Sequence, residues 1–181
     1  EILNSAIGRE AGRPFTVSEY NQPWPNSYGA EINPTVAAFA AFQGWDSVMY
    51  FAYSHGRLFY SQNKYPYIPF EGDVPGGFNL SGDWARWANF GQSAWLFRSG
   101  AIRAGEDPIE IPVSRELRLQ AAKERRNGSF SDYFSRKLGY VERQALLHPV
   151  QLARDDNRQI PESAKQPLSS PYVSDTGQTS Y

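Results

Sequence analysis

The stretch that decides the interpretation of this chain is Pro14-Phe15-Thr16-Val17-Ser18-Glu19-Tyr20-Asn21-Gln22-Pro23-Trp24-Pro25. Its first half is aromatic and β-branched, which is typical of a strand, and its prolines prevent a strand or helix from continuing. Glu19 therefore stands at the carboxyl end of a predicted strand, residues 14–19. In enzymes built from parallel strands, catalytic side chains project from this end. Glu19 is a candidate catalytic carboxylate, and pairing with an arginine or capping of backbone amides is the structural alternative.

The segment after this stretch predicts a βαβ unit. Residues 34–43 are rich in alanine and are predicted to form a helix, with Asn33 as its cap and Gly44 after its end. Residues 47–53 are apolar on both faces, as in a strand buried in a parallel sheet. The order of strand, helix and strand indicates an α/β fold with a right-handed crossover.

The character of the chain changes near Gly105. A long loop region, residues 56–91, leads into a predicted helix that starts at Trp84 or Asn89 and ends at Arg103. The chain beyond it is predicted to hold an edge strand, two helices and a further strand, at residues 109–113, 115–126, 129–138 and 145–152. We therefore expect two domains, residues 1–104 and 105–181.

The composition argues against several functional classes. The 181 residues include 18 basic and 19 acidic side chains with a formal net charge of -1, so neither nucleic acid nor a membrane is an expected partner. The chain has no cysteine and only two histidines, so no metal site and no cofactor is predicted. The sequence also lacks the motifs of phosphate-binding loops, serine nucleophile elbows and zinc hydrolases. The compartment stays open.

Aromatic residues make up 15% of the chain and are its most informative compositional feature. Aromatic side chains fill cores, and at loop tips they form flat platforms with a polar edge that suit sugar rings. Trp24, Tyr28, Tyr50 and Tyr53 are candidates to line such a pocket, with core packing as the alternative. His55 follows a strand end, where it could hydrogen-bond a ligand or act as an acid or base. Trp45, directly after Gly44, is interpreted as a packing anchor.

Five segments occur in an order that resembles a known enzyme family. They are residues 14–31, 37–46 (AAFAAFQGWD), 51–54 (FAYS), 78–83 (FNLSGD) and 94–100 (AWLFRSG). Together they resemble the last part of the (β/α)8 barrel of bacterial retaining glycoside hydrolases of clan A. Residues 146–148 and 172–177 look like pieces of the β-rich domain that often follows this barrel.

The resemblance implies that residues 14–19 and 47–53 are barrel strands seven and eight, and that Glu19 is the catalytic nucleophile. A retaining enzyme also needs a second carboxyl group, about 5 to 5.5 Å away, that protonates the leaving oxygen. In this clan that acid/base is usually a Glu directly after an Asn, and the chain contains no Asn-Glu pair. The side chains expected to shape the sugar site are Tyr20, Asn21, Trp24, Tyr28, Tyr53 and His55.

The resemblance therefore implies one part of a longer enzyme, because a complete barrel needs about 250 residues. Residues 1–104 would supply the last two β/α units of the barrel, and residues 105–181 linker helices and the start of a β-rich domain. The expected partners are a carbohydrate substrate and the remaining strands, in the same or a companion chain. By itself this part is expected to be inactive.

Two other functional classes stay open. A non-catalytic carbohydrate-binding protein would keep the aromatic loops without acid/base chemistry. A structural or assembly module would use the same aromatic surface to contact another chain and would have no affinity for sugars.

Overall fold

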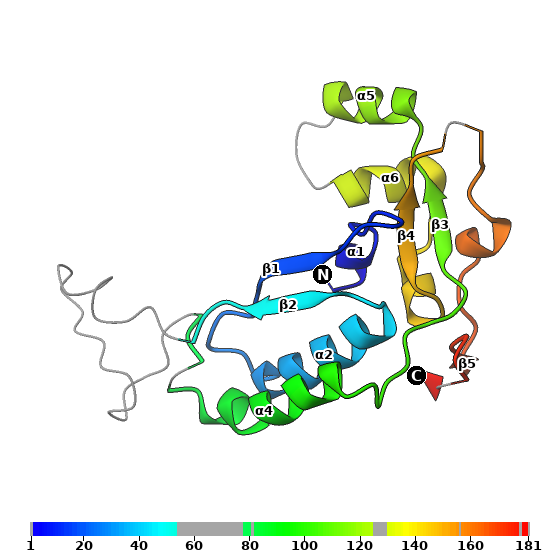
Figure 1. Cartoon of the computed structure of the whole chain (residues 1–181). Helices are drawn as coiled ribbons and strands as arrows, with labels where there is room; N and C mark the ends of the chain where they lie inside the picture. The colour runs from blue at the N-terminus through cyan, green and yellow to red at the C-terminus, as the bar shows by residue number, and fades with distance from the viewer. Residues whose placement is uncertain are drawn as a thin grey trace. The chain divides into compact units, whose positions relative to one another are not determined.

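The computed structural model describes residues 2–53, 78–80, 82–124, 130–155, 157–177 and 179–180 (Figure 1). The chain divides into two units. The first unit comprises residues 1–15, 42–44 and 103–181, and the second comprises residues 16–41 and 45–102. The N-terminal segment thus groups with the C-terminal half of the chain. The predicted domains, residues 1–104 and 105–181, stay a prediction.

The second unit is built on two parallel strands, β1 (Thr16–Tyr20) and β2 (Ser47–Tyr50). Val17 pairs with Val48, and Tyr20 pairs with Tyr50, so β1 contains one more residue than β2 between these pairs. This irregularity is a β-bulge at Ser18 and Glu19. The predicted parallel pairing of the two strands is confirmed, and β1 ends one residue after the predicted Glu19. β2 ends at Tyr50, three residues before the predicted Tyr53. The predicted burial of residues 47–53 on both faces is wrong, because Met49 is 54% exposed and Tyr53 is 47% exposed. The sheet of this unit has no further described strand, so a closed barrel stays a prediction.

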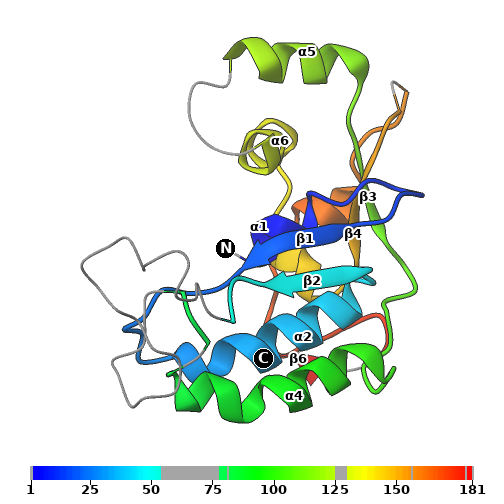
Figure 2. The same cartoon turned by 60° about the vertical axis from the view of Figure 1, so that its left-hand side comes forward.

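Two helices cover one face of this sheet. The short 3-10 helix η1 (Gly29–Glu31) leads into α2 (Ile32–Phe42), and α4 (Trp84–Arg98) follows β2. Figures 1 and 2 show α2 and α4 side by side on the same side of β1 and β2. Both helices were predicted, but α4 ends five residues before the predicted Arg103. The crossover from β1 through α2 to β2 is the expected βαβ arrangement.

The predicted cap of α2 is wrong. The helix begins at Ile32, so Asn33 lies inside it and cannot cap it. The Asn33 side chain instead donates hydrogen bonds to the Arg86 carbonyl oxygen, at 2.9 Å, and to the Asn89 side-chain oxygen, at 3.0 Å. Asn33 is buried, and a buried amide needs such partners. Its contact with α4 therefore outweighs the local preference of asparagine for helix caps.

The core of the second unit is apolar and aromatic. Along α2, Val36, Phe39 and Ala40 are buried. The Phe39 and Trp45 rings meet edge to face with their centroids 5.6 Å apart. Trp45 is 5% exposed, so its interpretation as a packing anchor is confirmed.

The first unit has its own parallel pair, β3 (Ile109–Pro112) and β4 (Val150–Ala153). Its remaining elements are α1 (Ile2–Ala6), α5 (Arg115–Glu124), α6 (Phe130–Leu138), η2 (Glu142–Leu146), η3 (Glu162–Lys165), β5 (Tyr172–Val173) and β6 (Thr179–Ser180). The strand predicted at residues 145–152 is wrong in its first half, because η2 continues to Leu146 and β4 begins only at Val150. β5 and β6 pair antiparallel.

Gln43 holds together several backbone segments of the first unit. It is fully buried, and its side-chain nitrogen donates to the carbonyl oxygens of Ala145, at 2.7 Å, and His148, at 3.0 Å. Its side-chain oxygen accepts a hydrogen bond of 2.9 Å from the Val150 backbone nitrogen. The amide is thus matched to two acceptors and one donor, as a buried polar group requires.

None of the helices in the described ranges combines the length and the apolar character needed to cross a bilayer.

Candidate functional site at the ends of β1 and β2

Glu19 lies at the carboxyl end of β1 and is exposed. Its neighbour Tyr20 pairs with Tyr50, and both tyrosines line a cavity between the sheet and the two helices. The β-bulge interrupts the regular alternation of side chains along β1, and Glu19 is exposed and does not line this cavity. Within the described residues, the Glu19 carboxylate has no hydrogen-bond or ion-pair partner. It is therefore available to a ligand or to groups outside these residues.

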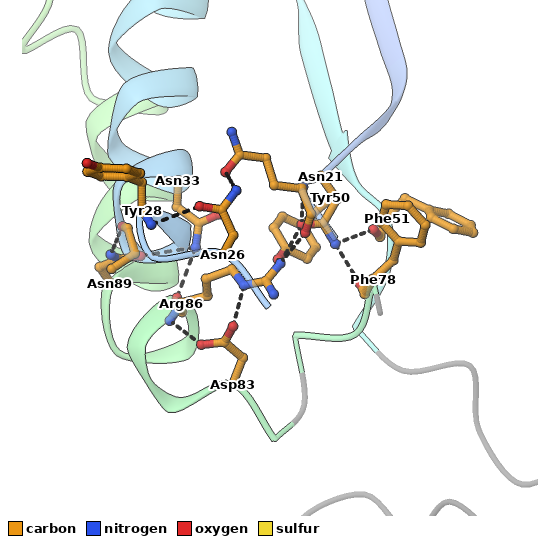
Figure 3. Close-up of polar contacts among 12 residues, drawn as sticks. Asn21, Asn26, Tyr28, Asn33, Tyr50, Phe51, Phe78, Asp83, Arg86 and Asn89 are labelled. Carbon is orange, nitrogen blue, oxygen red and sulfur yellow. Dashed lines mark hydrogen bonds and ion pairs between the residues drawn. The ribbon is translucent and has the colours of Figure 1, made fainter. Parts of the chain in front are cut away.

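Asn21, the first residue after β1, uses its whole side-chain amide in internal hydrogen bonds. Its nitrogen donates to the carbonyl oxygens of Phe51, at 2.6 Å, and Phe78, at 2.5 Å. Its oxygen accepts from the Gln22 backbone nitrogen, at 2.7 Å, and from Arg86 Nη1, at 2.8 Å. Figure 3 shows Asn21 between the Arg86 guanidinium and the two phenylalanine carbonyls. This geometry favours a positioning role, and direct contact of Asn21 with a sugar stays a prediction.

Arg86 is the charged centre of the site and is fully buried. It lies in the first turn of α4, where Asp83 caps the helix by accepting a hydrogen bond from the Arg86 backbone nitrogen. The Asp83 carboxylate also lies 2.5 Å from Arg86 Nε and neutralises the guanidinium. Arg86 Nη1 donates to Asn21, to the Gln22 carbonyl oxygen at 2.7 Å and to the Tyr50 hydroxyl at 3.3 Å. One arginine thus connects α4 to both strands of the sheet.

Tyr50 completes this polar cluster at the end of β2. Burial raises the pKa of its hydroxyl above the ordinary value, and the nearby Arg86 guanidinium opposes that rise. The hydroxyl is therefore neutral at physiological pH and accepts the hydrogen bond from Arg86. The Tyr50 ring meets Phe90 of α4 edge to face, with the centroids 5.5 Å apart.

Ala52, two residues after the end of β2, forms backbone hydrogen bonds with residues 78–80. The Ala52 nitrogen donates to the Phe78 carbonyl oxygen, and the Leu80 nitrogen donates to the Ala52 carbonyl oxygen, both at 2.9 Å. The peptide bond between Phe51 and Ala52 is cis. Because Asn21 contacts the carbonyls of Phe51 and Phe78, these segments meet at one point beside the end of β1.

The loop after β1 is fixed by two asparagines. Asn26 accepts a hydrogen bond of 2.8 Å from the Tyr28 backbone nitrogen and donates one of 3.0 Å to the Gln22 side chain. Asn89 of α4 donates a hydrogen bond of 2.6 Å to the Ala30 carbonyl oxygen (Figure 3). The loop that carries Trp24 and Tyr28 is therefore anchored at both of its ends.

Several aromatic side chains remain exposed around this point. Trp24 is 39% exposed and Tyr28 is 69% exposed, both on the loop after β1. Tyr53 is 47% exposed and packs against Trp87 of α4, with ring centroids 5.6 Å apart. Exposed aromatic rings at a strand end are suited to contact with an amphipathic ligand. The predicted His55 lies outside the described residues.

The cavity between the sheet and the helices is separate from this site. It has a volume of about 350 Å³ and is lined mainly by apolar side chains of α2, β2 and α4. Among the residues predicted to line a pocket or shape the site, Tyr20 and Tyr50 line it, and Glu19 does not. The cavity is therefore on the helix-covered side of the sheet, and the Glu19 carboxylate is not part of it. In the part of the chain described by the structure, no cluster of His, Cys, Asp and Glu could hold a metal ion.

Comparisons of the chain with protein-family models, with curated proteins and with solved structures find no match. The assignment of a function therefore depends on the site itself. The sequence interpretation missed Arg86 and Asp83, although an Asp three residues before an Arg at a helix start is a recognisable capping pattern. It also missed the role of the Phe78 carbonyl, for which the sequence holds no signal.

Proposed function

We propose that this chain is the C-terminal part of a clan A retaining glycoside hydrolase, in which Glu19 is the catalytic nucleophile. The observation that carries the proposal is the exposed Glu19 carboxylate at the carboxyl end of a parallel strand. In a (β/α)8 barrel, catalytic groups project from the carboxyl ends of the strands. The substrate class is an oligosaccharide or polysaccharide.

The proposed reaction is a double displacement. Glu19 attacks the anomeric carbon while a second carboxylic acid protonates the leaving oxygen, which forms a glycosyl ester on Glu19. A water molecule, deprotonated by the same second group, then hydrolyses this ester with overall retention of configuration. The second carboxyl group and the other barrel strands belong to residues beyond this chain, in the same or a companion polypeptide.

The other predicted site residues have different roles in this proposal. Tyr53 and Trp24 offer exposed aromatic surface for sugar rings, whereas the amide of Asn21 fixes the strand ends. The exposed Tyr28 extends the same surface along the loop after β1.

Azide rescue of Glu19→Ala in the full protein tests the assigned role. With an activated aryl glycoside, loss of the nucleophile should nearly abolish turnover, and azide should restore it and give a glycosyl azide of inverted configuration. Glu31→Ala, which removes an exposed carboxylate of η1, is the matched control and should retain activity. A glycosyl azide of retained configuration would instead assign Glu19 as the acid/base.

Non-catalytic sugar binding is the second candidate, and the exposed aromatic residues favour it. Trp24, Tyr28, Tyr53 and Trp87 would bind a sugar whether or not chemistry follows. This candidate predicts saturable binding of oligosaccharides with no hydrolysis by the full protein. A structural module predicts neither binding nor hydrolysis in the same assays.

A further inference from the structure

The end of β1 is held in place from two sides. On one side, Arg86 Nη1 donates to the Asn21 side-chain oxygen and to the Gln22 carbonyl oxygen, at 2.8 and 2.7 Å. On the other side, the Asn21 nitrogen donates to the carbonyl oxygens of Phe51 and Phe78. Glu19 lies two residues before Asn21, so its backbone is fixed by contacts that originate on α4. Figure 3 shows this chain of contacts from Asp83 through Arg86 to Asn21 and Phe51.

Stability alone is a poor explanation for this arrangement. Arg86 is fully buried, and a buried ion pair loses hydration that its partners only partly replace. Well-packed apolar side chains of similar volume often stabilise a fold as much or more. Arg86 Nη2 is also buried without a hydrogen-bond partner among the described residues, which is unfavourable for stability. What the guanidinium does supply is a fixed geometry, because its planar fork orients several acceptors at once.

We propose that Arg86 is a positioning residue that orients Glu19 for nucleophilic attack by holding Asn21 and Gln22. This inference rests on the proposed function of Glu19. Arg86 does not itself contact substrate in this account, since it is fully buried and its contacts are with protein groups. Its effect should appear in the covalent step and not in binding, because misplacement by about 1 Å can slow a reaction by about 100-fold.

The test measures covalent labelling of the full protein by 2-deoxy-2-fluoro glycosyl dinitrophenolates of gluco, manno and galacto configuration. The time course gives the inhibition constant for binding and the rate constant for formation of the ester on Glu19. The variants are Arg86→Lys and Arg86→Met, and the matched control is Arg98→Lys, an exposed arginine at the other end of α4. Thermal unfolding of each variant gives the fraction that is folded at the assay temperature.

We expect the labelling rate constant of both Arg86 variants to fall by about 10- to 100-fold while the inhibition constant changes by less than about threefold. Lysine should not rescue the rate, because its single ammonium cannot reproduce the fork of the guanidinium. Arg98→Lys should match the wild-type protein. A rate constant within twofold of wild type in a folded Arg86 variant would overturn the inference, as would a loss that only tracks the unfolded fraction.

Two further measurements keep the inference testable if a variant or the labelling fails. Where the Arg86 variants do not fold, Asn21→Ser removes the same connection and leaves the Arg86–Asp83 pair, and it should show the same fall in rate. If no probe labels the wild-type protein, the proposed function fails. Hydrogen exchange then tests the positioning role of Arg86 without any labelling. Faster exchange of the backbone amide hydrogens of residues 19–24 in Arg86→Met, but not in Arg98→Lys, supports the positioning role. An exchange rate in Arg86→Met equal to that of the wild-type protein rejects it.

Discussion

The side-chain nitrogen of Asn21 lies 2.6 Å from the carbonyl oxygen of Phe51, so the first residue after β1 is bonded to the first residue after β2. The same nitrogen reaches the Phe78 carbonyl oxygen, and the same amide's oxygen accepts from Arg86. Three segments that are distant in sequence therefore converge beside Glu19. This convergence, more than any single side chain, defines the candidate site.

Asn21→Ala should destabilise the second unit by about 2 to 3 kcal/mol. The substitution removes the donor to two carbonyl oxygens and leaves the buried Arg86 with one fewer acceptor. Urea denaturation followed by tryptophan fluorescence measures the change. Gln92→Ala, an exposed position on α4, is the control and should stay within about 0.5 kcal/mol of wild type. Equal stability of the two variants would contradict the role assigned to Asn21.

Two glycine substitutions should have opposite effects. A Cβ atom at Gly105 would lie 2.3 Å from the Pro149 side chain, so Gly105→Ala should destabilise the first unit by about 1 to 3 kcal/mol. At Gly91, inside α4, no heavy atom beyond its chain neighbours and the adjacent helix backbone lies within 4 Å of the added carbon. Gly91→Ala should therefore stabilise the helix by about 0.5 to 1 kcal/mol. Melting temperatures that shift in the same direction for both variants would be inconsistent with the packing described.

Gln43→Met should destabilise the first unit by about 2 to 4 kcal/mol. Methionine is similar in size, but it leaves the Val150 nitrogen and the Ala145 carbonyl oxygen without their partner in a buried position. The control is Gln120→Met on the exposed side of α5, which should change the free energy of unfolding by less than about 0.5 kcal/mol. A small effect at Gln43, measured in the same urea titrations, would show that these backbone groups find other partners.

Tyr50 should make stability depend on alkaline pH. Its pKa is raised by burial, so the folded state holds the proton that the unfolded state loses above about pH 10. The contribution of Tyr50 is therefore complete below about pH 10 and is lost as the pH rises towards the pKa of the folded state. Tyr50→Phe should weaken this alkaline loss without removing it, because burial also raises the pKa of Tyr140. Melting temperatures measured across this range that are parallel for both proteins would contradict this.

Much of the local structure could be predicted because the signals are local. The β-branched run before Glu19, the alanine-rich segment that became α2 and the apolar residues of β2 each point to their own element. The errors occur where a tertiary contact decides the outcome. Asn33 was expected to cap α2, but its side chain instead donates hydrogen bonds to Arg86 and Asn89. The apolar pair Leu146-Leu147 suggested a strand, yet η2 extends to Leu146.

The candidate site was predictable only in part. Glu19 was proposed from its place at a strand end, and that place could be predicted because it depends on neighbouring residues alone. Arg86 was not, because its contact with Asn21 joins residues 65 positions apart, and no periodicity or motif reports such a contact. The hydrogen bonds of the Asn21 side-chain nitrogen could not be predicted for the same reason. They go to the backbone carbonyl oxygens of Phe51 and Phe78, and every residue carries such an oxygen.

The most direct test of the central claim is peptide mapping of the full protein after reaction with the 2-deoxy-2-fluoro glycosyl dinitrophenolates. We expect one glycosyl group to be attached to the peptide that contains residues 14–25, and fragmentation to place it on Glu19. We also expect Glu19→Gln to abolish the label. A label on a different carboxylate, or full hydrolytic activity of Glu19→Gln, would contradict the account.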